Sequence, residues 1–123
     1  MATKGRILIA DDRENNRNCL RECIEDFFPN YSIELCEDGR VLDGLLRENS
    51  DRINLVITDN DMPGFTGIDI IRRYASKGIP IVLCYAGNKE VGREALQHGA
   101  FGIIEKPYSF QDVVDVVRRV FFH

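Results

Sequence analysis

The sequence lacks several features that mark common classes of protein. It has no apolar run that approaches the roughly 20 residues of a membrane-spanning helix. Its 16 basic and 20 acidic residues give a formal charge of -4, and no basic patch indicates contact with nucleic acid. The segment from Met1 to Arg6 is short and polar, unlike a secretory signal peptide. We therefore expect a cytoplasmic protein that binds neither a membrane nor nucleic acid.

No linker, internal repeat or low-complexity tract divides the 123 residues. A chain of this length can bury a core of its own without disulfide or metal staples. We therefore predict a single domain over residues 1–123.

Cysteine and histidine, the usual ligands of transition metals, are sparse. The four cysteines form no C-x-x-C pair. Cys19 and Cys23 lie four residues apart in a helical pattern and so could share a metal, but no histidine lies nearby to complete the site. Buried reduced thiols are the favoured interpretation. His98 and His123 lie near a helix end and at the end of the chain, and neither is placed for catalysis.

Short apolar runs alternate with amphipathic stretches along the chain. The runs cover residues 7–10, 32–36, 55–58, 81–85 and 102–104. The first, third and fourth runs are nearly continuous in apolar residues, which is typical of strands that are buried on both faces of a parallel sheet. The stretches between them repeat their apolar residues three and four positions apart, which is typical of helices.

Residues that commonly begin or end helices mark the boundaries. The signals for a beginning are the capping-box pairs Thr66 with Asp69 and Ser109 with Asp112, and the single caps Asp38 and Asn88. The signals for an end are Pro29, Gly78 and Gly99. The strand-helix order repeats five times, and right-handed crossovers then predict an α/β fold with a doubly wound sheet and helices on both faces.

Charged side chains follow three of the predicted strands. Asp11 and Asp12 end the first, Asp59 ends the third with Asp61 just after it, and Lys106 follows the fifth. Ligands of such sheets bind beyond the carboxyl ends of the strands, so we expect these side chains in one crevice. Solvated loops would account for any one acid, but poorly for the whole set.

Clustered carboxylates repel one another unless a cation neutralises them, and hard oxygen ligands suit Mg²⁺. A lysine opposite the metal suits a phosphoryl oxygen. A carboxylate can itself be the nucleophile and form an aspartyl phosphate. The set therefore predicts a Mg²⁺-dependent carboxylate that accepts phosphate.

Several segments together resemble the landmarks of the response-regulator receiver family. They are residues 7–12, 55–64 (L-V-I-T-D-N-D-M-P-G) and 105–107 (E-K-P), supported by residues 36–39 and 99–102. The resemblance implies a flavodoxin-like sheet of five parallel strands in the order 2-1-3-4-5, with five helices. It also implies that a histidine kinase or a histidine phosphotransfer protein donates the phosphoryl group, with Mg²⁺ as the cofactor.

The resemblance assigns roles by position. Asp59 resembles the phosphoacceptor, and Lys106 resembles the lysine that binds the phosphoryl group. The implied metal ligands are Asp11, often through water, Asp12, Asp59 and the main chain of Asp61. The bond between Lys106 and Pro107 resembles one that is commonly cis.

Two positions depart from the family pattern. Tyr85 stands where the family usually has threonine or serine, and Ile103 stands where it usually has tyrosine or phenylalanine. The acceptor chemistry is complete, whereas the usual pair of switch residues is missing. We expect the Tyr85 ring near the mouth of the crevice, where it would gate access of the phosphodonor.

Two other functions are compatible with these motifs. The D-x-D of Asp59 and Asp61 resembles the nucleophile motif of haloacid-dehalogenase-type phosphatases, but that motif usually follows the first strand, so we do not expect an enzyme. The second alternative is a binding module that kept the receiver fold and lost the switch. Tyr85 and Ile103 favour it, and the intact acceptor residues oppose it.

The last helix is a candidate partner surface. Its predicted core stripe is Phe110, Val113, Val114, Val117, Val120 and Phe121. Val116 and Phe122 fall partly outside that stripe, which would suit a downstream protein target or a homodimer. A broad buried face is the equal alternative.

Overall fold

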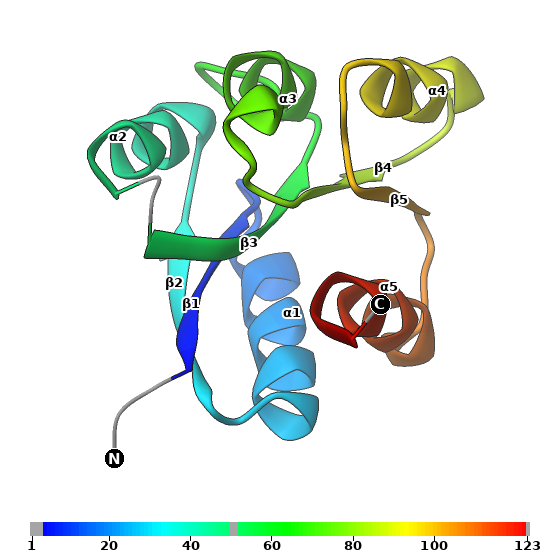
Figure 1. The fold of residues 1–123 in the computed structure, drawn as a ribbon. Helices are drawn as coiled ribbons and strands as arrows, with labels where there is room; N and C mark the ends of the chain where they lie inside the picture. The colour runs from blue at the N-terminus through cyan, green and yellow to red at the C-terminus, as the bar shows by residue number, and fades with distance from the viewer. Residues whose placement is uncertain (1–3, 50–51, 123) are drawn as a thin grey trace.

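The computed structural model describes residues 4–49 and 52–122, in which strands and helices alternate (Figure 1). The strands are β1 (Gly5–Ala10), β2 (Tyr31–Cys36), β3 (Ile53–Asp59), β4 (Ile81–Tyr85) and β5 (Gly102–Glu105). The helices are α1 (Glu14–Phe27), α2 (Gly39–Asn49), α3 (Gly67–Tyr74), α4 (Lys89–Gln97) and α5 (Phe110–Phe122), with a 3-10 turn, η2 (Ala75–Lys77), after α3. Within the described residues, no helix has the length and apolar character needed to span a membrane.

The five strands form one parallel sheet in the order β2-β1-β3-β4-β5. Helices α1 and α5 cover one face of the sheet, and α2, α3 and α4 cover the other (Figure 1). This arrangement confirms the predicted doubly wound, flavodoxin-like fold. Because β1 lies between β2 and β3, the chain reverses its direction of winding there, and ligand crevices form at such a point.

Two layers of apolar side chains hold the helices to the sheet. Side chains of a strand alternate between its faces, so Ile7 and Ile9 pack toward α1 and α5, whereas Leu8 and Ala10 pack toward α2 and α3. The same alternation in β3 and β4 makes both faces of the sheet centre apolar. The only polar side chains that the strands bury within the described residues are Thr58 and Asp59, at the end of β3.

The predicted helix beginnings are confirmed by hydrogen bonds, while α3 itself ends at Tyr74 and a 3-10 turn fills the stretch up to Gly78. Thr66 and Asp69 form the capping box of α3, with each side chain accepting the other residue's backbone N–H. Ser109 and Asp112 do the same ahead of α5. The two predicted single caps are also confirmed. The side chain of Asp38 accepts backbone N–H groups at the start of α2, and that of Asn88 accepts one at the start of α4.

The exposure of three side chains decides one open alternative, at Val116, and corrects the expectation at Phe110 and Cys19. Val116 of α5 is only 5% exposed, because Gly102 of β5 leaves room for its side chain. Phe110, predicted to be core, is 47% exposed because it is the first residue of α5 and lines an open groove beside α1. Cys19 is exposed, while the other three cysteines are buried free thiols as predicted.

A buried carboxylate joins α2 to α3. The Tyr74 hydroxyl donates to Asp43 Oδ1 at 2.7 Å, and Arg47 Nη2 lies 2.6 Å from Oδ2. Arg73 lies 3.6 Å from the same carboxylate. Burial would raise the pKa of Asp43, but the hydrogen bonds from Tyr74 and Arg47 and the arginine charges outweigh it, so the net pKa is lowered.

We expect this carboxylate to make stability depend on acid pH. A lowered pKa in the folded state adds stability that is complete above the unfolded pKa of about 3.9 and is lost as the pH falls through the folded value. The parent should therefore lose more stability than Asp43→Asn does between about pH 5 and pH 3. Tyr74→Phe should cost about 1–2 kcal/mol at neutral pH. Urea denaturation at several pH values measures both effects, and parallel pH curves for parent and Asp43→Asn would contradict the assignment.

Candidate functional site

The carboxyl ends of the five strands are joined at one edge of the sheet by backbone hydrogen bonds that continue past the strands. The Asp11 N–H donates to the Cys36 carbonyl at 3.1 Å, and the Asn60 N–H donates to the Cys84 carbonyl at 3.0 Å. Lys106 donates its backbone N–H to the carbonyl of Tyr85 at 2.7 Å. The residues just beyond β1, β3 and β5 are therefore held as firmly as the strands themselves.

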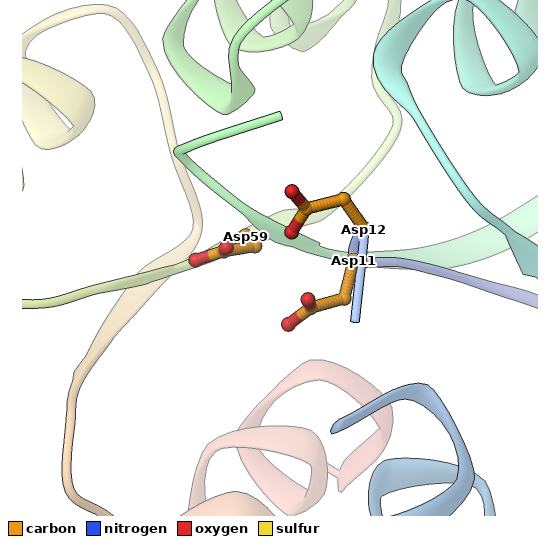
Figure 2. Close-up of side chains that lie close together, drawn as sticks. All are labelled: Asp11, Asp12 and Asp59. Carbon is orange, nitrogen blue, oxygen red and sulfur yellow. The ribbon is translucent and has the colours of Figure 1, made fainter. Parts of the chain in front are cut away.

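Three carboxylates meet at this edge. Asp11, Asp12 and Asp59 each offer an oxygen, and these oxygens lie within 4.8 Å of one another. Figure 2 shows Asp11 and Asp12 side by side at the end of β1, with their carboxylates extending toward the side on which Asp59 lies. Asp11 is 1% exposed and Asp59 is 8% exposed, whereas Asp12 is exposed. The expectation that these three acids lie close together at the carboxyl edge of the sheet is confirmed.

Asp11 and Asp59, the two buried acids of the site, are held by a lysine, an arginine and a backbone N–H. Lys106 Nζ lies 3.0 Å from Asp59 Oδ1 and 3.8 Å from Asp11 Oδ2. The backbone N–H of Arg13 donates to Asp11 Oδ1 at 2.9 Å, and Arg17 Nη1 donates to the Asp11 main-chain carbonyl at 2.8 Å. The bond between Lys106 and Pro107 is cis, as the family resemblance implied.

The pKa values of Asp59 and Lys106 reflect the burial and the neighbouring charges of these two side chains. Burial raises the pKa of Asp59, the nearby Lys106 opposes it, and the charge of Asp11 adds to the increase, so the net pKa is raised. Burial alone would lower the pKa of Lys106, but its hydrogen bond to Asp59 and the charges of Asp59 and Asp11 raise it overall. The lysine thus stays charged, and one ammonium group does not neutralise the cluster.

The loop after Asp59 is organised by Asn60. Its main-chain carbonyl accepts the Gly67 N–H at 3.1 Å, and its side-chain oxygen accepts the Ile68 N–H at 3.1 Å. Gly67 lies too close to the end of β3 to be replaced by a residue with a side chain, since a Cβ there would be 2.7 Å from the Asp59 carbonyl oxygen. These contacts lock the start of α3 against the end of β3.

A hollow of about 230 Å³ lies over the acids and is lined by Asp12, Arg13, Asp59, Asp61, Ala86 and Lys106. Asp61 is therefore at the site, with an exposed side chain. Tyr85 is not among the lining residues and is 6% exposed. A Cβ on Gly92 of α4 would lie 2.8 Å from the Tyr85 hydroxyl and 2.9 Å from Ile103 Cδ1. The Tyr85 ring thus lies beneath α4 and not at the mouth of the crevice, where the sequence placed it.

The donor set fits a hard divalent cation. All three potential ligands are carboxylate oxygens, two of them from adjacent residues, and nitrogen and sulfur ligands are absent from this group. Oxygen ligands in small number, with room for water and a phosphate oxygen, suit Mg²⁺. Cys19 and Cys23 belong to no group of three potential ligands among the described residues, so the alternative metal site is not supported.

Three contributors to the site were missed from the sequence. Arg17 holds the main chain of Asp11, Asn60 organises the following loop, and Arg13 lines the hollow. Arg13 directly follows the acid pair and Arg17 lies one helical turn further along α1, so their positions offered a signal. Nothing in the residue pattern distinguished Asn60 from an ordinary loop residue.

Comparisons with known proteins agree with the fold and identify the family. A family model described as the response regulator receiver domain matches residues 7–118. Response regulator MprA of Mycolicibacterium vanbaalenii is 34% identical over 118 residues, covering 94% of this chain and 49% of MprA. Chemotaxis protein CheY of Pseudomonas aeruginosa is 28% identical, covering 94% of this chain and 95% of CheY. The chain therefore belongs to the response regulator receiver domain family.

Solved structures show the same fold. A response regulator receiver domain protein from Clostridium thermocellum superimposes with a TM-score of 0.86 at 23% identity, over 94% of this chain and 93% of that one. Chemotaxis response regulator CheY4 of Vibrio cholerae gives a TM-score of 0.77 at 26% identity, over 96% and 99% of the two chains. Among the curated relatives, the chain spans about half of MprA and 28% of the cyclic di-GMP phosphodiesterase response regulator RpfG of Xanthomonas campestris. Activities of these longer proteins that lie outside the matched region are properties of those proteins alone.

Proposed function

We propose that this receiver accepts a phosphoryl group on Asp59, with Mg²⁺ as the cofactor, from a histidine kinase or a histidine phosphotransfer protein in the cytoplasm. The chain is proposed to act as one receiver domain over residues 1–123 and not as an enzyme that turns over free phosphomonoesters. The observation that carries the proposal is the meeting of Asp11, Asp12 and Asp59 with Lys106 at the carboxyl edge of the sheet.

Each residue is proposed to have one role. Asp59 ends a buried strand, so its carboxylate faces the hollow with little freedom to turn away, and it is the nucleophile that attacks phosphorus. Lys106, now paired with Asp59, would bind an oxygen of the incoming phosphoryl group. Asp11, Asp12, Asp59 and the main-chain carbonyl of Asp61 would hold Mg²⁺. When bound, Mg²⁺ neutralises the acids and stabilises the charge on the phosphoryl oxygens.

Tyr85 favours a second candidate function. Its ring fills the space beneath α4, so a receiver-fold binding module without the usual switch is the alternative. A downstream protein or a second copy is proposed to bind at α5. Because Val116 is buried, that surface depends on Phe122, which is 71% exposed, and on Phe110.

Labelling with a small phosphodonor tests the proposal directly. Incubation with acetyl phosphate and Mg²⁺ should add one phosphoryl group to the intact mass of the parent. Asp59→Asn should abolish the gain, because an amide cannot take the place of the nucleophilic carboxylate. Removing Mg²⁺ with EDTA should do the same.

The matched control is Asp61→Asn, which removes one acid from the same hollow but keeps the main chain proposed to bind the metal. It should still gain the phosphoryl group. Labelling of Asp59→Asn at the parental level would refute the acceptor assignment. A parent chain that gains no mass would favour the binding module.

A further inference from the structure

Arg13 is a charged residue in the wall of the hollow that the proposed chemistry does not use. It lies between Asp12 and the first residue of α1, with extended backbone angles (φ -100, ψ 121). Its backbone N–H donates to Asp11 Oδ1, but its exposed side chain makes no capping hydrogen bond. The main chain of Arg13 therefore helps to hold Asp11, whereas its side chain does not cap α1.

Helix stability does not explain an arginine at this position. Serine, threonine, aspartate and asparagine are the favoured residues before a helix, because their oxygens accept the free N–H groups. A positive charge at this end of a helix also opposes the helix dipole. Arg13 is unfavourable on both counts, so another interaction is needed to account for its charge.

The guanidinium of Arg13 has no partner among residues 4–49 and 52–122. Some helical arginines are paired: Arg47 with Asp43, Arg72 with Glu94 and Arg93 with Glu90. The arginines of α2 and α5 that are unpaired within the described residues, which include Arg118, do not line the hollow over the acids, whereas Arg13 does. Arg17, one turn further along α1, donates to the Asp11 carbonyl. For Arg13 only the backbone N–H is engaged, which leaves its five guanidinium N–H donors available to a ligand.

Arg13 stands where two hollows meet. It lines the 230 Å³ hollow that contains Asp59, and it also lines a groove of about 550 Å³ between α1 and the segment from Pro107 to Phe110. Arg13, Ala86 and Lys106 line both. A donor that enters along the groove therefore passes Arg13 before it reaches Asp59.

We propose that Arg13 binds the oxygens of the phosphodonor on its way to Asp59 and favours donors that carry two negative charges. The inference rests on the proposed function. Three carboxylates repel a phosphoryl dianion. Among the described residues that line the hollow, Lys106 is the one basic residue besides Arg13, and the proposed Mg²⁺ would add to its charge. The planar guanidinium can bind two phosphoryl oxygens at once.

The transfer step needs no proton from Arg13. The bond from Asp59 Oδ to phosphorus forms as the bond from phosphorus to the donor's leaving atom breaks. The leaving group keeps the electron pair of that bond, so acetyl phosphate releases acetate. Arg13 and Lys106 stay protonated throughout and act only through charge and hydrogen bonds.

Labelling kinetics of Arg13→Gln test the inference. With saturating Mg²⁺ and a series of acetyl phosphate concentrations, the second-order rate constant of labelling should fall about tenfold, the worth of one charge-assisted hydrogen bond. Arg13→Lys should recover part of the rate. Phosphoramidate carries less negative charge at neutral pH, so its rate should fall by a smaller factor. The parental rate should also decrease more steeply with salt than the rate of the variant.

Arg118→Gln is the matched control, because it removes one exposed arginine from α5, away from both hollows. It should label at the parental rate with both donors. Equal slowing of both donors by Arg13→Gln, with no recovery in Arg13→Lys, would indicate a distorted site and overturn the inference. A parental rate for Arg13→Gln would overturn it while leaving Asp59 as the acceptor. A parent that gains no phosphoryl group would overturn the proposed function and this inference together.

Discussion

Replacing Gly39 by alanine is expected to lower the free energy of unfolding by about 3 kcal/mol, the upper part of the usual range for overpacking. A Cβ on Gly39 would lie 1.9 Å from the carbonyl oxygen of Phe65 and 2.6 Å from the backbone nitrogen of the same residue. These are backbone atoms, so no rotamer change can relieve the clash. The Gly39 N–H also donates to the Pro63 carbonyl at 3.1 Å.

The same substitution should affect the site. Pro63 and Phe65 belong to the loop between Asp59 and α3, so moving that loop away from α2 disturbs the segment that follows the acceptor. We therefore expect Gly39→Ala to label more slowly with acetyl phosphate even at a temperature where it is folded. Urea denaturation gives the stability, and intact mass over time gives the labelling rate.

Gly44→Ala provides the matched control within the same helix. Nothing lies within 4 Å of a Cβ at Gly44, which is in the interior of α2. Alanine should therefore stabilise the helix by about 1 kcal/mol through its higher helix propensity and leave labelling unchanged. If the two variants unfolded at the same urea concentration, the close approach of Gly39 to Phe65 would not be a real constraint.

The fold could be predicted from the sequence because its signals are local. The capping boxes at Thr66 and Ser109 form within four residues of chain, and the apolar runs of β1, β3 and β4 are recognised from their length and composition. The sequence left burial open where it depends on a distant residue. Val116 is buried because Gly102, on a different element, has no side chain to exclude it.

The acids of the site were predictable for a similar reason. Parallel strands bring their carboxyl ends to one edge, so the positions of Asp11, Asp12 and Asp59 followed from the strand order. The strand order does not determine the direction in which a side chain at that edge points. Tyr85 could be assigned to the end of β4, but its ring direction depends on Gly92, which lies on a helix that packs over the strand.

The side chains of Tyr85 and Ile103, which form the layer packed beneath α4, decide how phosphorylation can be transmitted. In the family that the chain belongs to, the position of Ile103 usually holds an aromatic residue, and the position of Tyr85 usually holds a small hydroxyl residue. Here the aromatic ring comes from β4 and lies, like the side chain of Ile103, directly beneath Gly92 of α4. Ile103 is branched at Cβ and rotamer-restricted, which makes it a poor element for switching between two packed positions.

Gly92 is the residue that makes room for the ring. A Cβ there would lie 2.8 Å from both the Cζ and the hydroxyl oxygen of Tyr85. Because the ring is 6% exposed, it cannot move outward without breaking the packing of α4 against β4 and β5. A ligand shifts an equilibrium only if it has different affinities for two states, and this layer offers a single packed state.

Beryllofluoride, which mimics the phosphoryl group, is therefore expected to change amide NMR shifts mainly from Tyr85 to Asn88. The reporters Ile103 and Val116, which lie on β5 and α5, should change little. The double variant Tyr85→Thr/Ile103→Tyr returns the ring to β5 and a short hydroxyl to β4, so its shift changes should extend to both reporters. The comparison needs only the two proteins with and without the mimic, in the presence of Mg²⁺. Large shift changes at Ile103 and Val116 in the parent would show that a two-state switch operates despite the packed ring.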